Sequence, residues 1–169
     1  MLVVLLSGWL GMVLLSGRGG SPLHLHNAQP RPVRAVQALD AQADPVRFSC
    51  TVEGVHDGDG PIYCGERDED GRKIKIRLGG IAARELDESC RANQPCPVAS
   101  GLEAKTELLR LATGHVLQCL RIGRSYARTV AYCSNGVVDL SCAMIRSGKA
   151  LRWEKYDLER RLVGCAPAE

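Results

Sequence analysis

The chain has 169 residues, which is enough for one domain of ordinary size and an accessory segment. Its 22 basic and 19 acidic side chains leave a formal charge of only +3, so overall charge gives no argument for nucleic-acid binding. Any site for a phosphate must therefore depend on a local arrangement of side chains.

Residues 1–16 form an apolar run without a charged side chain. The run is shorter than the roughly 20 residues of a membrane span and has the length of a signal-peptide core. It has no basic segment before it and no clear cleavage site after it, so an uncleaved anchor and a misplaced start codon are alternatives. We assign residues 1–27 to a signal peptide or N-terminal membrane anchor. Residues 28–45, in which apolar residues do not recur at a regular spacing, are assigned to a flexible linker.

Short alternating runs begin at Val46 and predict two strands, 47–55 and 61–66. The turn between them has the sequence Asp57-Gly58-Asp59-Gly60, whose residue types alone are explained by turn conformation. This hairpin would place Cys50 near Cys64.

A third strand is predicted over residues 73–81, because Ile74, Ile76 and Leu78 alternate with Lys75 and Arg77. The strand contains a Gly79-Gly80 pair, where the backbone can bend or be approached closely. The chain then reaches Arg84 and Glu85. A carboxylate held near arginines suits the attack of water on a phosphate, whereas the alternative interpretation is a surface ion-pair cluster.

A polar loop between Glu85 and Pro97 contains Cys90 and Cys96, which would close it beside the site. The capping box of Ser100 and Glu103 then predicts a helix that ends at Gly114.

A second hairpin is predicted from strands 115–122 and 126–133, joined through residues 123–125. It would place Cys119 near Cys133, and Arg121, Arg124 and Arg128 would give it local positive charge.

Two further helices are expected, one over about residues 138–147 and a short charged one over 154–162. Trp153 and Tyr156 are interpreted as packing residues rather than residues that stack on bases.

The chain contains eight cysteines, an even number, and none of them forms a C-x-x-C pair. This pattern argues against a zinc ribbon and predicts an exported domain with disulfide bonds. Three pairs follow from the predicted hairpins and loop, and elimination leaves Cys142 with Cys165. The candidates are Cys50, Cys64, Cys90, Cys96, Cys119, Cys133, Cys142 and Cys165.

Five short strands, with the first helix between the third and fourth, predict an α+β fold over residues 46–165. We expect a five-stranded Greek-key β-barrel of the OB type with two or three helices. The exposed face of such a barrel commonly binds oligonucleotides.

Three segments in this order resemble the staphylococcal nuclease (thermonuclease) family: a D-G-D turn, then R-L-x-G-I-x-x-x-E, then Y-x-R-x-x-A-Y. The resemblance covers about residues 46–153. It implies that Asp59 and the carbonyl of Ala83 bind calcium, that Arg77 and Arg128 hold the phosphate, and that Glu85 acts on the attacking water. Arg84 and Arg124 would add positive charge for nucleic acid.

Ala82 stands where the family has an aspartate that binds calcium, and Arg84 stands where it has a proline. A hard cation needs several oxygen ligands, so the loss of one carboxylate weakens the expected calcium site. Asp87 or Glu88 is the candidate for a replacement ligand.

The leading hypothesis is a monomeric phosphodiesterase, an endonuclease that hydrolyses DNA or RNA with Ca²⁺ and is secreted, periplasmic or anchored to a membrane. The alternative is an inactive nuclease-like module that binds nucleic acid or another anionic ligand by charge. A third hypothesis is a disulfide-rich envelope protein with a structural or docking role.

Overall fold

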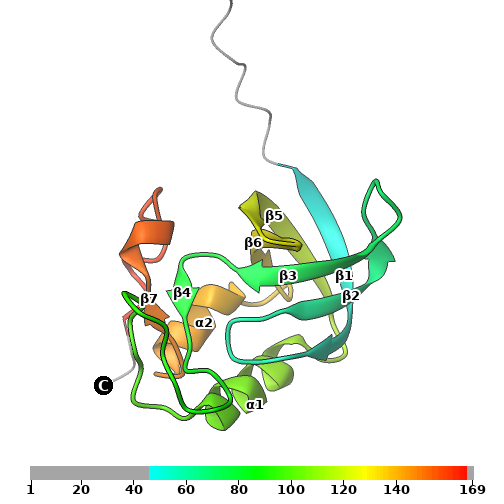
Figure 1. The fold of residues 1–169 in the computed structure, drawn as a ribbon. Coiled ribbons are helices and arrows are strands. Elements are labelled where there is room, and N and C mark those ends of the chain that lie inside the picture. Colours follow the sequence, from blue (N-terminus) through cyan, green and yellow to red (C-terminus); the bar gives the residue numbers. More distant parts are fainter. Residues whose placement is uncertain (1–45, 167–169) are drawn as a thin grey trace, which may run out of the picture. The chain divides into compact units, whose positions relative to one another are not determined.

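The computed structural model describes residues 46–166 (Figure 1). The predictions for residues 1–27 and 28–45 lie outside the described residues. No helix among residues 46–166 has both the length and the apolar character that a membrane crossing requires.

Five strands close a barrel in the order β1-β2-β3-β6-β5 (Figure 1). All neighbouring strands are antiparallel except β3 and β6, which are parallel. This arrangement confirms the predicted α+β fold with a closed five-stranded barrel. The strands are β1 (Arg47–Val55), β2 (Ile62–Arg67), β3 (Lys73–Leu78), β5 (Val116–Ser125) and β6 (Arg128–Ser134).

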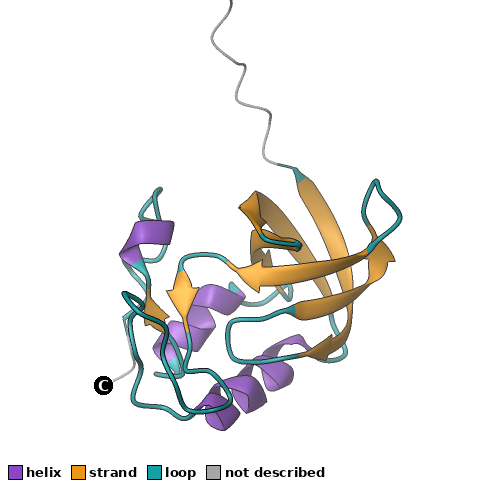
Figure 2. Ribbon diagram, viewed as in Figure 1, coloured by secondary structure: helices purple, strands orange, loops and turns teal. Residues whose placement is uncertain are grey.

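Two α-helices pack beside the barrel, α1 (Gly101–Ala112) and α2 (Leu140–Arg146), shown in purple in Figure 2. The predicted capping box at the start of α1 is present, because Ser100 accepts from the Glu103 N–H and the Glu103 carboxylate accepts in return from Ser100. Asp139 caps α2 by accepting from the Cys142 N–H. Local sequence signals are therefore sufficient to explain where both helices begin.

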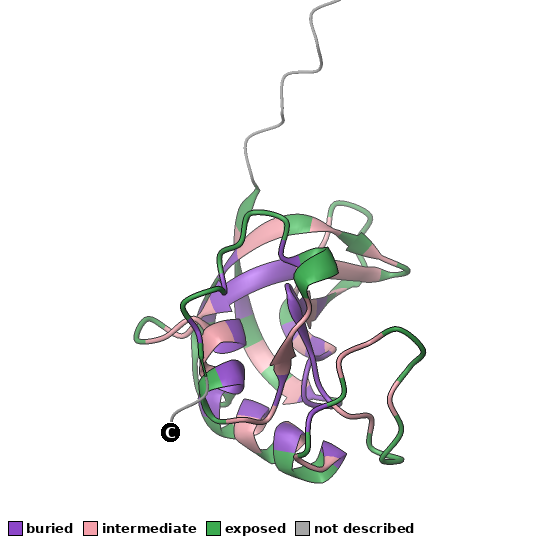
Figure 3. Ribbon diagram, turned by 90° about the vertical axis from the view of Figure 1, so that its left-hand side faces the viewer, coloured by how far each residue is buried: buried purple, intermediate pink, exposed green. Residues whose placement is uncertain are grey.

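The apolar face of each element points into one continuous core (Figure 3). Alternate residues of the strands enter the barrel, and the apolar stripe of each helix covers the neighbouring strands. The core includes the fully buried side chains of Ile62, Ile76, Leu78, Leu108, Leu117, Leu140 and Met144.

Four disulfides join the cysteines in the predicted pairs, and none of the cysteines is free. Each bond removes conformational freedom from the unfolded chain and so favours the folded state. Four disulfides in one small domain indicate an extracellular or otherwise oxidising compartment. The pairs are Cys50–Cys64, Cys90–Cys96, Cys119–Cys133 and Cys142–Cys165.

The predicted strand 73–81 is divided in two. β3 ends at Leu78, and after the Gly79-Gly80 turn the chain continues as β4 (Ile81–Ala82), which pairs with β7 (Leu151–Arg152). Gly80 has a φ of +71°, and a Cβ there would lie 2.8 Å from a methyl group of Leu162. The glycine therefore permits both the bend and the close approach of the C-terminal segment.

The predicted helix over 154–162 is wrong. The structure has one 3-10 turn, η1 (Glu154–Tyr156), followed by irregular turns. The carboxylate of Asp157 accepts hydrogen bonds from the N–H groups of Arg161 and Leu162, and so competes with a helical ladder. Arg160 also has a φ of +54°, which a helix does not accommodate.

The turn of the second hairpin also differs from the prediction. β5 extends to Ser125 and β6 begins at Arg128, so the turn consists of Tyr126 and Ala127. Tyr126 has a φ of +56° and is 91% exposed, whereas the prediction placed it inside a strand.

Candidate functional site

The Asp57–Gly60 turn lies against α1 and β4. A Cβ on Gly58 would come within 2.3 Å of the Ala104 Cβ and 2.8 Å of the Ala83 Cβ, so only glycine fits there. Asp57 accepts a hydrogen bond from the Asp59 N–H and both aspartates are buried. Tight packing thus presents Asp59 to β3 in one orientation.

Asp59 and Arg77 form a paired ionic contact. Arg77 Nη1 lies 2.6 Å from Asp59 Oδ1, and Nη2 lies 2.9 Å from Oδ2. Oδ2 also accepts from the Ala83 N–H at 3.2 Å. The exposed fractions of the two side chains are 14% for Arg77 and 7% for Asp59, so the pair is largely removed from water. Both carboxylate oxygens that the resemblance assigns to a metal are therefore bonded to protein donors.

The second predicted calcium ligand, the carbonyl of Ala83, accepts a hydrogen bond of 2.8 Å from the Gln94 side chain. Ala82 contributes no carboxylate and is fully buried. Among residues 46–166 the only three candidate ligands within 4.8 Å of one another are Cys50, Cys64 and Glu66, and these two cysteines form a disulfide. This donor set does not fit calcium, which takes about six to eight oxygen ligands.

Three carboxylates, those of Asp57, Asp59 and Glu85, lie close enough to affect one another. Burial raises the pKa of Asp59 most strongly, Arg77 lowers it, and Asp57 and Glu85 raise it, so that the pKa lies at about 6. Burial likewise raises the pKa of Asp57, and Glu85 adds to the increase. Two arginines balance these three carboxylates, Arg77 at Asp59 and Arg91 at Glu85.

Glu85 begins the loop over residues 85–97, which contains the Cys90–Cys96 disulfide. Its carboxylate pairs with Arg91 of the same loop at 2.9 Å, and its side chain is 26% exposed. The loop approaches α1 closely, because a Cβ on Gly101 would lie 2.1 Å from the Glu85 carbonyl oxygen. The expected closed loop beside the site is therefore present, and it fixes the backbone that carries Glu85.

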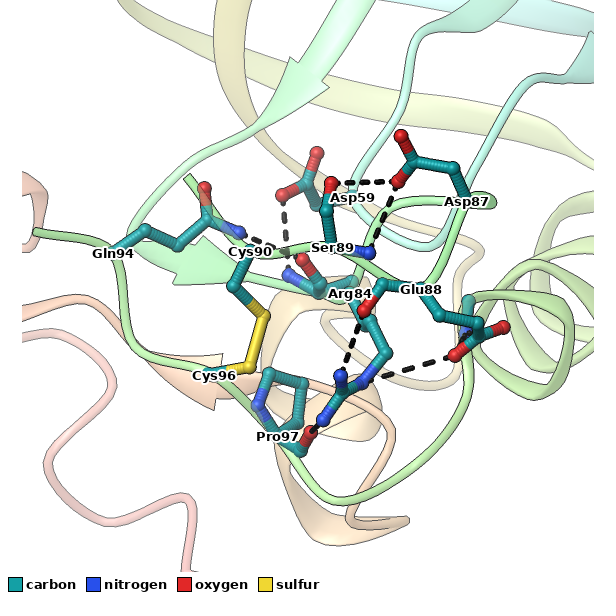
Figure 4. Close-up of a disulfide and its surroundings, with 11 residues drawn as sticks. Asp59, Arg84, Asp87, Glu88, Ser89, Cys90, Gln94, Cys96 and Pro97 are labelled. Carbon is teal, nitrogen blue, oxygen red and sulfur yellow. Dashed lines mark hydrogen bonds and ion pairs between the residues drawn. A yellow bond between two sulfur atoms is a disulfide. The ribbon is translucent and has the colours of Figure 1, made fainter. Parts of the chain in front are cut away.

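Arg84 is directed into this loop. It donates to the carbonyls of Glu88 and Pro97 at 2.8 and 2.9 Å, and its Nε lies 3.8 Å from the Glu88 carboxylate (Figure 4). The structure therefore gives Arg84 a role in holding the loop, and Arg84 does not line the cavity described below.

The two candidate replacement ligands also have other partners. Glu88 accepts from the Gly101 N–H at the start of α1, and Asp87 accepts from the N–H and hydroxyl of Ser89. Neither carboxylate completes a cluster of ligands with Asp59.

A cavity of about 550 Å³ opens beside the Asp59–Arg77 pair. Arg77 and Arg128 both line it, although 50 residues of chain separate them, and Arg124 lines it as well. Arg77 is paired with Asp59 and Arg91 with Glu85. Arg124 and Arg128 also line the cavity, and neither forms an ion pair with a carboxylate within residues 46–166.

Aromatic side chains form another part of the lining. Trp153 and Tyr156 contact each other edge to face with their ring centroids 4.5 Å apart, as expected of packing residues, but both also line the cavity. Tyr132 lines it too and donates its hydroxyl to the buried carboxylate of Asp157 at 3.0 Å. Burial and Asp157 raise the pKa of Tyr132, which keeps this hydroxyl a donor.

The sequence-based reasoning missed Arg91 and Gln94 as contributors to the cavity, and Asp157 as the anchor of its C-terminal wall. The position of Arg91 beside Cys90 was a usable signal, because a closed loop next to Glu85 was expected. Nothing local in the sequence distinguishes Asp157 from the charged residues around it.

The site thus belongs to an α+β protein with a closed five-stranded mixed barrel, and it combines a buried acid–arginine pair with an arginine-rich cavity. No protein-family model matches the chain, and no curated protein sequence matches it.

Proposed function

We propose that this protein is an exported nuclease-like barrel that binds nucleic acid in the cavity beside Arg77 and Arg128. The observation that carries the proposal is the cavity itself, which has four arginines and one carboxylate, that of Glu159, among its lining residues. The order of the motifs that resemble the staphylococcal nuclease family supports the same ligand class. The four disulfides support a secreted or periplasmic location.

Arg124 and Arg128 are the phosphate-binding residues in this proposal. A guanidinium group donates two parallel hydrogen bonds to a phosphate, and these bonds are strong where water is partly excluded. Trp153 and Tyr156 supply aromatic rings to the cavity, and stacking of a base on such a ring tolerates any base. Arg77 has a different part, because its charge is already balanced by Asp59, to which each terminal nitrogen donates one hydrogen bond.

Hydrolysis of the bound strand is the second candidate function. Glu85 favours it, because its carboxylate is bound to Arg91, which lines the cavity. A ligand phosphate that attracts Arg91 would release the Glu85 carboxylate to orient water. Since the donor set does not fit calcium, no step of this proposal uses a metal.

Fluorescence anisotropy with a labelled oligonucleotide tests the binding. We expect Arg128→Gln to weaken binding about tenfold, because it removes a cation from the cavity. Arg146→Gln is the matched control: Arg146 is exposed at the end of α2 and makes no side-chain hydrogen bond or ion pair with residues 46–166. Equal binding by the wild type, Arg128→Gln and Arg146→Gln would refute the proposal.

Gel analysis of the same oligonucleotide, with calcium or with a chelator, separates binding from hydrolysis. An oligonucleotide that stays uncleaved both with calcium and with the chelator identifies a binding module. Cleavage that survives the chelator and is lost in Glu85→Gln identifies a metal-independent hydrolase. Cleavage that requires calcium would show that the Asp59–Arg77 pair opens to admit a cation.

A further inference from the structure

A second basic hollow, of about 280 Å³, lies next to the cavity and shares Arg124, Tyr126 and Arg128 with it. Its remaining lining comes mainly from β3 and the turn before it. Lys73 and Lys75 are exposed there, and Arg72 adds a further charge. The two hollows therefore adjoin at the turn between β5 and β6.

One strand supplies cations to both hollows. Lys73, Lys75 and Arg77 occupy alternate positions of β3 and so lie on the same face, about 6.6 Å apart at each step. Arg77 lines the cavity, while Lys73 and Lys75 line the second hollow. β6 runs parallel beside β3, with Thr129 opposite Ile76, which brings Arg128 at the start of β6 next to this row.

The cations of the second hollow have partners that a ligand can replace. Arg72 pairs with Asp70 at 3.0 Å in an exposed contact, and Lys75 lies 5.9 Å from the centre of the Tyr63 ring. Lys73 pairs with Glu53 at 2.5 Å in an exposed contact, which contributes little to stability and is easily exchanged for a phosphate. Asp68, the only acidic residue of the lining, accepts from the N–H groups of Asp70 and Arg72. Its charge is therefore partly balanced inside its own turn.

Tyr126 stands where the two hollows meet. It is 91% exposed, lines both hollows and has a φ of +56°, a conformation that costs free energy in a residue other than glycine. An aromatic ring held in this way between two groups of cations is suited to stack on a base of a bound strand.

We infer that the ligand is a single-stranded nucleic acid that runs from the cavity, past Tyr126, into the Lys73–Lys75 hollow, so that a strand of several nucleotides binds more tightly than a dinucleotide. This inference rests on the proposed function and adds to it the length and course of the ligand.

The test compares Lys73→Gln/Lys75→Gln with the charge-matched control Lys105→Gln/Arg146→Gln, whose residues make no side-chain hydrogen bond or ion pair in the described part of the chain. Anisotropy titrations use a dinucleotide and an oligonucleotide of about twelve nucleotides, which is within the site sizes of barrels of this kind. We expect the β3 variant to lose about tenfold in affinity for the longer strand and none for the dinucleotide. For the β3 variant, the plot of log K against log salt concentration should be less steep by about 1.4, which corresponds to the loss of two phosphate contacts.

A second variant tests the chemistry of the ligand. Tyr126→Ala should weaken the oligonucleotide about fivefold and leave inorganic polyphosphate, which has no bases, unaffected. Equal loss for both ligands would overturn the assignment to nucleic acid.

The outcomes distinguish the inference from the proposed function. If the dinucleotide and the longer strand bind equally, and both depend on Arg128, the cavity binds nucleic acid and the extended course is refuted. If the wild type binds neither ligand, the proposed function itself fails.

Discussion

Two buried aspartates, Asp59 and Asp157, are each bonded to an arginine at 2.6 Å, yet their surroundings differ. Asp157 accepts from Arg152, the Tyr132 hydroxyl and the N–H groups of Arg161 and Leu162. Asp59 accepts from Arg77 and one N–H group, and two further carboxylates lie nearby. One aspartate therefore has a surplus of donors and the other a surplus of acids.

The pKa values of the two groups move in opposite directions for this reason. The pKa of Asp59 is raised to about 6, mainly by burial and also by Asp57 and Glu85, although Arg77 lowers it. Burial also acts on Asp157, but the bonds from Arg152, Leu162 and Tyr132 hold its pKa below the ordinary value. Burial alone thus does not set the direction of a pKa shift, because the balance of neighbouring donors and acids decides it.

The largest effect is expected from Asp157→Ala. The change leaves Arg152, a tyrosine hydroxyl and two N–H groups without their acceptor, so the free energy of unfolding should fall by about 4 kcal/mol. Denaturant unfolding of the oxidised protein measures this. A loss below about 1 kcal/mol would mean that water replaces the carboxylate, and the description of Asp157 as an anchor would be wrong.

Arg77→Met is expected to cost about 3 kcal/mol, because it leaves Asp59 buried without its cation. The added change Asp59→Asn should recover part of the loss, since the neutral amide needs no counter-ion and no longer repels Asp57 and Glu85. A double-mutant cycle in the same unfolding assay gives the coupling energy. If the two losses simply add, the pair makes no net contribution and the contrast with Asp157 disappears.

The two aspartates should also affect the pH dependence of the free energy of unfolding in opposite directions. This effect is smaller than the losses expected from the two substitutions. The pKa of Asp59 in the folded protein is above its unfolded value of 3.8. Its contribution to the free energy of unfolding is therefore complete below pH 3.8 and is lost as the pH rises to about 6. The lowered pKa of Asp157 gives the opposite sign, with a contribution that is present above pH 3.8 and lost in more acidic solution. The Asp59 effect is at most about 3 kcal/mol and is shared with Asp57.

Unfolding free energies of the wild type and Asp59→Asn, measured from pH 4 to pH 7, check this sign. The wild type should lose stability relative to the variant as the pH rises. Parallel curves would show that Asp59 ionises in the folded protein as it does in the unfolded chain.

Much of the barrel was predictable because its signals are local. The alternation of Ile74, Ile76 and Leu78 defines β3, and the Ser100–Glu103 capping box defines the start of α1. Three cysteine pairs followed from the two hairpins and one short loop, and the fourth, Cys142–Cys165, followed by elimination. The motif order also brought Arg77 and Arg128 to one cavity.

The remaining features depend on contacts between distant segments, which local patterns do not encode. The bond between Asp59 and Arg77 spans 18 positions, and the one between Gln94 and the Ala83 carbonyl crosses the closed loop. The charged run after Trp153 has helical composition, but Asp157 takes the N–H groups that a helix would use. Arg84 was expected to contact the ligand, but it donates to the Pro97 carbonyl instead. Nothing in the sequence indicates this contact.

The outward row on β3 restricts how this surface can evolve. Insertion or deletion of one residue within the strand would turn Lys73, Lys75 and Arg77 toward the barrel and bring Ile74 and Ile76 to the surface. Substitutions of the exposed Lys73 and Lys75 leave the core untouched, whereas Arg77 also balances the buried Asp59. The charge of this surface can therefore change by single substitutions at Lys73 and Lys75, while a change in the length of the strand would disrupt the core.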